Sequence, residues 1–154
     1  MKKQLSIFLI LVISSCGFKI VDHSKLTNYK VINIETIGEK RINYKLKNKL
    51  LINNSDINAK SINLVLNTSK QRIIKERNIR NEITKYSLKI NVKAEALIPE
   101  DEKRLVFNVA KNGDYLARDK YSQTLNNEKK LIELLTDDIS DEIYNKLISK
   151  LNDL

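Results

Sequence analysis

The sequence has few residues with the chemistry of catalysis or metal binding. Among its 154 residues there is one cysteine, Cys16, and one histidine, His23. A single cysteine excludes a disulfide within the chain. A lone histidine without a second histidine or cysteine leaves a nucleophile–base pair or a histidine-rich metal site without its parts. The composition therefore argues against an enzyme and predicts neither a metal nor a cofactor.

Proline, glycine and long apolar runs are also scarce. The chain has one Pro and three Gly, and it shows no low-complexity linker and no internal repeat. Its length is enough for one domain with one core. The apolar run within residues 5–13 is well below the roughly 20 residues that a membrane-spanning helix needs. A permanent spanning helix is therefore not predicted.

The first sixteen residues are typical of a secretion leader. Lys2 and Lys3 precede the apolar run, which ends at the stretch Ile13-Ser14-Ser15-Cys16. This stretch fits the lipobox of bacterial lipoproteins, in which the cysteine sulfur is joined to a diacylglycerol before the leader is removed. We predict a signal peptide over residues 1–15 and lipid attachment at Cys16. The alternative is an ordinary signal peptide that ends at a chance cysteine.

Lipidation at Cys16 would hold the mature protein on a membrane, because two or three acyl chains anchor far more firmly than one. Residues 16–28 are predicted to be the lipidated N-terminus and a tether, followed by a single domain over residues 29–154. Gly17 follows the cysteine, where Asp would act as the inner-membrane retention signal. The predicted location is therefore the outer membrane, with the domain on the periplasmic side or inside a barrel lumen.

The chain is basic, with a formal net charge of +9. Basic domains bind nucleic acid, anionic lipid or acidic proteins, and secretion removes nucleic acid from these partners. The surplus of cations has another explanation, because the high content of Lys, Ile and Asn is typical of an AT-rich genome. Only the placement of the cations therefore argues for a function.

Hydrophobic periodicity predicts the order strand, helix, three strands, helix. Alternation favours strands at 29–35, 62–66, 85–96 and 105–109, and spacings of three and four favour helices at 40–53 and from Asn126 or Asn127 to the C-terminus. The fold class is α+β: a mostly antiparallel four-stranded sheet with two helices packed on one face. Asn112-Gly113 is either a hairpin turn or a bulge within one strand.

The order of these features resembles the LptE family of LPS-assembly lipoproteins. The resemblance rests on Cys16-Gly17-Phe18 after the lipobox, "KYSLKINVKAEAL" in mid-chain, and the closing helix "EKKLIELLTDDISDEIYNKLISKL". It covers essentially the whole mature chain. It implies a non-enzymatic partner and plug of the outer-membrane β-barrel LptD, which supports barrel assembly and binds lipopolysaccharide.

Cations cluster in the segment "SKQRIIKERNIR", which the sequence places where the second strand meets the third. Arginine binds phosphate and carboxylate through paired hydrogen bonds, and lipopolysaccharide presents both groups. The candidate lipopolysaccharide contacts are Arg72, Lys75, Arg77, Arg80 and Lys129. The alternative is a solvated hairpin tip whose charges serve solubility. The carboxylates of residues 137–142 are interpreted as a solvated helix face.

A second function remains open on the same features. The chain would also suit a structural adaptor lipoprotein of another envelope complex, which binds protein and has no lipid ligand. A polar sheet face fits either function, since the lumen of a membrane β-barrel is polar. The partner that co-purifies with the native protein would distinguish them.

Overall fold

The structure, a computed structural model, describes residues 29–51 and 59–152. Its elements are β1 (Tyr29–Gly38), α2 (Lys40–Leu50), β2 (Lys60–Arg77), β3 (Ile83–Ile98), the short 3-10 helix η2 (Pro99–Asp101), β4 (Lys103–Leu116) and α3 (Tyr121–Asn152). The strands form one sheet in the order β1-β2-β3-β4, parallel between β1 and β2 and antiparallel elsewhere. The predicted α+β fold is confirmed. The predicted leader, Cys16 and tether lie outside the described residues.

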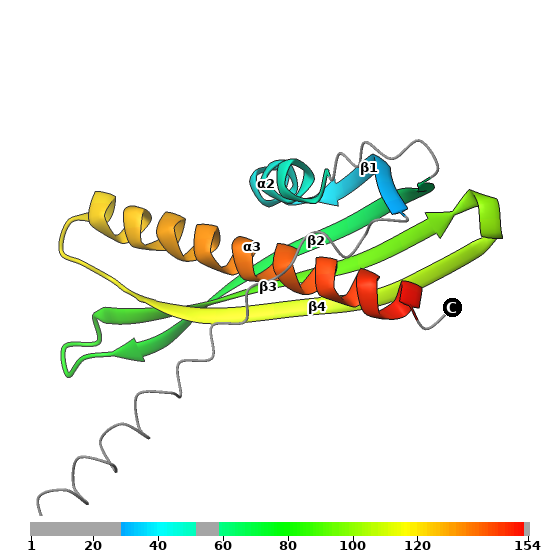
Figure 1. The fold of residues 1–154 in the computed structure, drawn as a ribbon. Coiled ribbons are helices and arrows are strands. Elements are labelled where there is room, and N and C mark those ends of the chain that lie inside the picture. The colour runs from blue at the N-terminus through cyan, green and yellow to red at the C-terminus, as the bar shows by residue number, and fades with distance from the viewer. Residues whose placement is uncertain (1–28, 52–58, 153–154) are drawn as a thin grey trace, which may run out of the picture.

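Both helices lie on the same face of the sheet, and α3 runs along its length (Figure 1). The core between them is built from the alternate residues of β3 and the apolar stripe of α3, as the periodicity predicts. Its fully buried members include Leu88, Ile90, Val92, Ala94, Ala96, Ile139, Ile143 and Leu147. No helix in the described ranges is both long and apolar enough to cross a membrane. None of the described elements covers the opposite face of the sheet.

The connection from β1 into α2 depends on Gly38. Its φ is +100°, and a Cβ at this position would lie 1.9 Å from the main-chain oxygen of Thr68 on the neighbouring strand. Glycine alone tolerates both conditions. The Thr68 hydroxyl accepts a hydrogen bond from the Glu39 amide at 3.0 Å and donates one to Asn43 Oδ1 at 2.7 Å. These bonds fix the start of α2 against β2 through polar groups that are buried.

Asn112-Gly113 is neither a hairpin turn nor a bulge. β4 continues through it, and the two residues pair in regular register with Lys89 and Leu88 of β3. A Cβ on Gly113 would lie 2.8 Å from a terminal methyl of Leu131 on α3. The glycine therefore lets the helix pack close to the strand.

The structure also corrects the limits of both helices. α3 begins at Tyr121 and not after Asn126 or Asn127, and the Asn127 side-chain amide donates to the Leu116 carbonyl at 3.0 Å. The hydroxyl of Thr124 accepts a hydrogen bond from the Arg118 amide at 2.8 Å, so a residue inside the first turn joins the helix to the preceding loop. α2 is confirmed but ends at Leu50.

Candidate functional site

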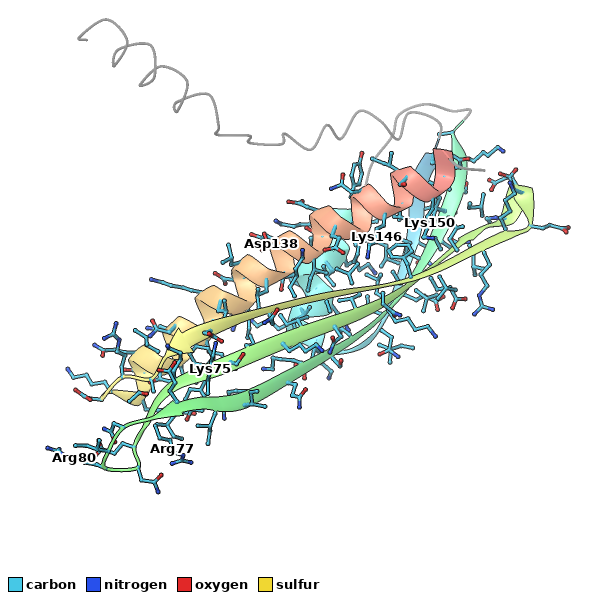
Figure 2. All side chains as sticks on the ribbon, turned by 90° about the horizontal axis from the view of Figure 1, so that it is seen from below. Lys75, Arg77, Arg80, Asp138, Lys146 and Lys150 are labelled. Atoms are coloured by element: carbon cyan, nitrogen blue, oxygen red, sulfur yellow. The ribbon has the colours of Figure 1, made fainter. Side chains whose placement is uncertain are left out.

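The candidate cations lie mostly on a strand, not in a loop. β2 extends to Arg77, so Arg72, Lys75 and Arg77 belong to the far half of the strand and only Arg80 lies in the turn to β3. The reason is that this half of β2 pairs with β3 from Leu88 back to Ile83, so that cross-strand hydrogen bonds continue a strand with no buried face. Figure 2 shows Lys75, Arg77 and Arg80 gathered at one end of the molecule.

The turn at this end, residues 78–82, is fixed by the side chain of Asn78. Its Oδ1 accepts hydrogen bonds from the amides of Arg80 at 2.9 Å and Glu82 at 3.0 Å, and its Nδ2 donates to the Glu82 carboxylate at 2.7 Å. Asn81 adopts a left-handed conformation with φ of 64°, which asparagine tolerates better than most residues. The apex therefore has a defined backbone geometry.

Arg72 is engaged inside the molecule. Its Nη1 donates to Glu128 Oε2 on α3 at 3.2 Å, and its guanidinium lies 5.0 Å from the centre of the Tyr86 ring. Glu128 also accepts a hydrogen bond from the Tyr115 hydroxyl at 3.0 Å, and Lys70 lies 3.5 Å from its other oxygen. Burial raises the pKa of Tyr115 to about 12. This Glu128 cluster joins β2, β4 and α3.

Lys75 is paired as well. Its ammonium group bonds the carboxylate of Asp114 on β4, and this hydrogen bond lowers the pKa of Asp114 and raises that of Lys75. On the same hairpin, Lys85 bonds Glu76 at 2.6 Å. Both pairs are exposed to solvent, and such pairs contribute little to stability. Their effect on the site is that Lys75 and Lys85 already have anionic partners.

The remaining candidates have no acidic partner among the described residues. Arg77 donates to the main-chain oxygen of Asn81 at 2.7 Å, and neither it nor Arg80 forms an ion pair with any described residue. The same holds for Lys129, which follows Glu128 on α3 and is exposed. The five predicted contacts thus divide into two internally neutralised cations and three that remain available to an external anion.

Some of the acidic residues of α3 form ion pairs along the helix surface. Glu142 bonds Lys111 at 2.7 Å and Lys146 at 2.9 Å, and these hydrogen bonds lower its pKa. Lys146 also donates to the main-chain oxygen of Asn108 on β4 at 2.9 Å, and Asp137 bonds Lys49 of α2 at 2.6 Å. Within residues 29–51 and 59–152 no group of His, Cys, Asp and Glu side chains is arranged to hold a metal ion.

Two features of this end were not predicted from the sequence. The first is Ile79, at the apex of the turn, whose side chain is 104% exposed. The second is a surface hollow of about 340 Å³ between β4 and α3, lined by apolar Leu116, Leu131 and Leu134 and by the cations Arg118 and Lys130, among others. The exposed apex could have been found from the sequence, because Ile79 stands as an apolar residue inside the polar stretch "RNIR". The hollow had no such signal, because its walls come from separate elements.

No protein-family model matches the chain, and no curated protein matches it in sequence. Solved structures do match it in three dimensions. A protein of Caulobacter crescentus assigned as a lipoprotein superposes with a TM-score of 0.58 at 16% identity, covering 84% of this chain and 93% of that one.

Two further solved structures share the fold. Rare lipoprotein B of Shewanella oneidensis gives a TM-score of 0.50 at 17% identity, covering 79% of this chain and 94% of that one. An uncharacterized lipoprotein B of Nitrosomonas europaea gives 0.51 at 12% identity, covering 86% and 88%. At such identities the likeness concerns the fold, and it extends over nearly the whole of each of these chains. The domain therefore has a fold that is also found in lipoproteins.

Proposed function

We propose that this chain is an outer-membrane lipoprotein of the LptE kind, which acts as partner and plug of an LptD-type β-barrel in lipopolysaccharide assembly. The observation that carries the proposal is the combination of a lipobox ending at Cys16 with a domain whose fold is shared with lipoproteins. Lipid on Cys16 anchors the protein, and the domain lies on the periplasmic side or inside the barrel lumen. The chain has no catalytic role in this proposal.

The uncovered face of the sheet supports a barrel as the partner. This face carries polar and cationic side chains that alternate along β2 and β3 with the buried residues of the other face. They include the exposed Asn67, Gln71, Lys89 and Lys93. The interior of a large membrane barrel is polar and tolerates such a surface without burying unpaired charges in lipid. A face of this composition would be costly to bury against an apolar partner.

The arginines at the end of the hairpin support lipopolysaccharide as the ligand. Arg77 and Arg80 have no acidic partner among the described residues, so their charges are available to phosphate or carboxylate groups. Charge-assisted bonds of this kind are about twice as strong as neutral ones. Arg72 and Lys75 would first have to exchange Glu128 and Asp114 for the ligand. We therefore assign the primary contacts to Arg77 and Arg80, with Lys129 as a neighbour.

The pairing of Arg72 and Lys75 also favours a second candidate function. A surface on which two of the five candidate cations are already neutralised within the molecule also suits an adaptor that binds protein and has no lipid ligand. In that case the chain would be a structural lipoprotein of another envelope complex.

Co-purification tests the proposal. The native protein is isolated from membranes under mild detergent, and its partners are identified by mass spectrometry. A barrel of the LptD type in stoichiometric amount is the expected result. Recovery of a periplasmic or inner-membrane complex, with no such barrel, would contradict the proposal and support the adaptor function.

A further inference from the structure

The side chain of Ile79 is fully exposed to solvent in the described domain. It lies at the apex of the β2–β3 turn and is 104% exposed, the highest value among the exposed large apolar residues. Removing such a side chain from water is favourable, so a fold with nearby apolar surface would ordinarily cover it. Here the apex points away from the core (Figure 1).

The turn prevents Ile79 from folding back. Asn78, directly before it, bonds the amides of Arg80 and Glu82 through its side chain, and the Asn78 amide donates to the Glu82 carbonyl at 2.9 Å. Arg77 closes the other side by donating to the Asn81 carbonyl. Because these bonds define the backbone on both sides, they hold the isoleucine at the tip of the turn. Such preorganisation lowers the entropy cost of a contact made there.

Cations flank the apolar apex. Arg77 and Arg80 stand on either side of Ile79, without an acidic partner in the described part of the chain. Further along the hairpin, Ile73 and Ile74 are about half exposed. An apolar tip between cations that reach outward is the arrangement of elements that lie at a membrane interface, where the apolar part enters the acyl boundary and the charges stay with the headgroups.

Other residues at this end of the molecule have the same character. The hairpin turn and the start of α3 lie at the same end of the elongated domain (Figure 1). The first residue of α3, Tyr121, is 71% exposed, and tyrosine is favoured at the level of lipid headgroups. Leu116, which pairs with Lys85 near the turn, is also exposed. The exposed apolar residues here are accompanied by Arg118 and Lys120.

We propose that the β2–β3 turn docks on an anionic phospholipid surface, with Ile79 inserted at the acyl boundary and Arg77 and Arg80 on the headgroup phosphates. The inference rests on the proposed function only in placing the domain on the periplasmic side of a membrane. It concerns the state in which Arg77 and Arg80 hold no lipopolysaccharide, and it requires no barrel. Attraction between the two arginines and the lipid phosphates selects anionic over zwitterionic surfaces. The choice of a lipid surface follows from the joint presence of the exposed isoleucine and the unpaired cations.

The absence of tryptophan from the chain allows a direct test. Ile79→Trp introduces a single fluorescent reporter at the apex, and Tyr44→Trp, on the exposed surface of α2, introduces one at a control position. The full chain, purified from membranes, is reconstituted with vesicles of phosphatidylglycerol or of phosphatidylcholine. Emission wavelength and quenching by brominated acyl chains report whether each tryptophan enters the bilayer.

The proposal expects a shift to shorter wavelength and strong quenching for Ile79→Trp in phosphatidylglycerol. Both effects should be largely lost in phosphatidylcholine and in the same reporter carrying Arg77→Gln and Arg80→Gln, while Tyr44→Trp stays unchanged throughout. Circular dichroism confirms that each variant keeps the fold.

Three results would overturn the proposal. No response of Ile79→Trp to phosphatidylglycerol would exclude insertion, and an equal response of Tyr44→Trp would indicate unspecific adsorption. A response that appears only when purified lipopolysaccharide or a barrel partner is added would assign the apex to that molecule. In the last case the proposed function would stand and the docking on phospholipid would not, so the two failures are distinguishable.

Discussion

Glu128 and Arg72 form an ion pair of 3.2 Å across 56 residues of sequence, which ties the early part of α3 to the far half of β2. Only 12% of the Glu128 side chain is exposed, and it also accepts the hydrogen bond of Tyr115. The pair therefore connects the projecting hairpin to the body of the domain.

Replacement of Glu128 should destabilise the domain. Glu128→Ala leaves a partly buried hydroxyl and two cations without their acceptor, and the expected loss is about 1–3 kcal/mol in the free energy of unfolding. Urea denaturation measures it. Glu133→Ala, on the same helix, removes an exposed carboxylate paired with Arg41 and should cost less than about 1 kcal/mol. Equal losses would mean that Glu128 does not connect the hairpin to α3.

Tyr115 should make stability fall at high pH. Its pKa is about 12 in the folded protein against 10.0 ordinarily, so the folded state holds the phenolic proton more tightly than the unfolded chain. The resulting stability is complete below pH 10 and is lost as pH rises toward 12. Denaturation curves of the wild type and Tyr115→Phe across this range isolate the effect, because lysines titrate in both. The same dependence of stability on pH in the wild type and in Tyr115→Phe would exclude this contribution of Tyr115.

Gly38→Ala should be the most damaging glycine substitution. It forces a side chain into a left-handed conformation and against a main-chain oxygen of β2, and strain of this kind costs at least about 1–3 kcal/mol. Gly113→Ala serves as the comparison, since its Cβ meets a terminal methyl of Leu131 that can move. Thermal unfolding should therefore show a larger loss for Gly38→Ala. The reverse order would contradict the described path from β1 into α2.

Charge reversal at the hairpin end tests the ligand. Arg77→Asp with Arg80→Asp should strongly reduce capture of lipopolysaccharide by the purified chain at physiological ionic strength, with the fold unchanged because both residues are exposed. Lys89→Asp with Lys93→Asp makes the same change of charge on the open sheet face. Long-range attraction alone would affect both pairs equally and would be screened by salt. Equal losses for the two pairs would mean that lipopolysaccharide binds through the overall positive charge of the domain and not through these two arginines. No loss for either pair would favour the adaptor function.

The predictions from sequence were correct for segments in which the apolar residues follow a single strand or helix period. Alternation from Leu88 to Ala96 and the stripe from Leu135 to Leu151 named the two main surfaces of the core, because each faces a continuous apolar layer. The far half of β2 has no buried side chain, so its strand conformation comes from pairing with β3 and leaves no hydrophobic period. Hydrophobic periodicity therefore does not predict the secondary structure of such a segment.

Only part of the arrangement of the candidate site could be predicted from the sequence, for a similar reason. The accumulation of cations near residues 70–80 is visible in the sequence, but which of them have partners depends on residues distant in the chain. Glu128 and Asp114 reach Arg72 and Lys75 only once α3 and β4 are packed. Asn112-Gly113 shows the same limit, because the packing of Leu131 and not a turn explains the glycine.

The contact between Lys146 and the Asn108 carbonyl has a consequence for assembly. β4 is an edge strand, and unpaired main-chain groups on such an edge are templates for a strand from another molecule. Lys146 occupies one of these acceptors and places a charge beside it, with Glu142 and Lys111 next to it. A strand approaching in register would have to displace an ammonium group that is already bonded twice. This contact therefore opposes the addition of a further strand at this edge, and it favours a sheet that stays four-stranded.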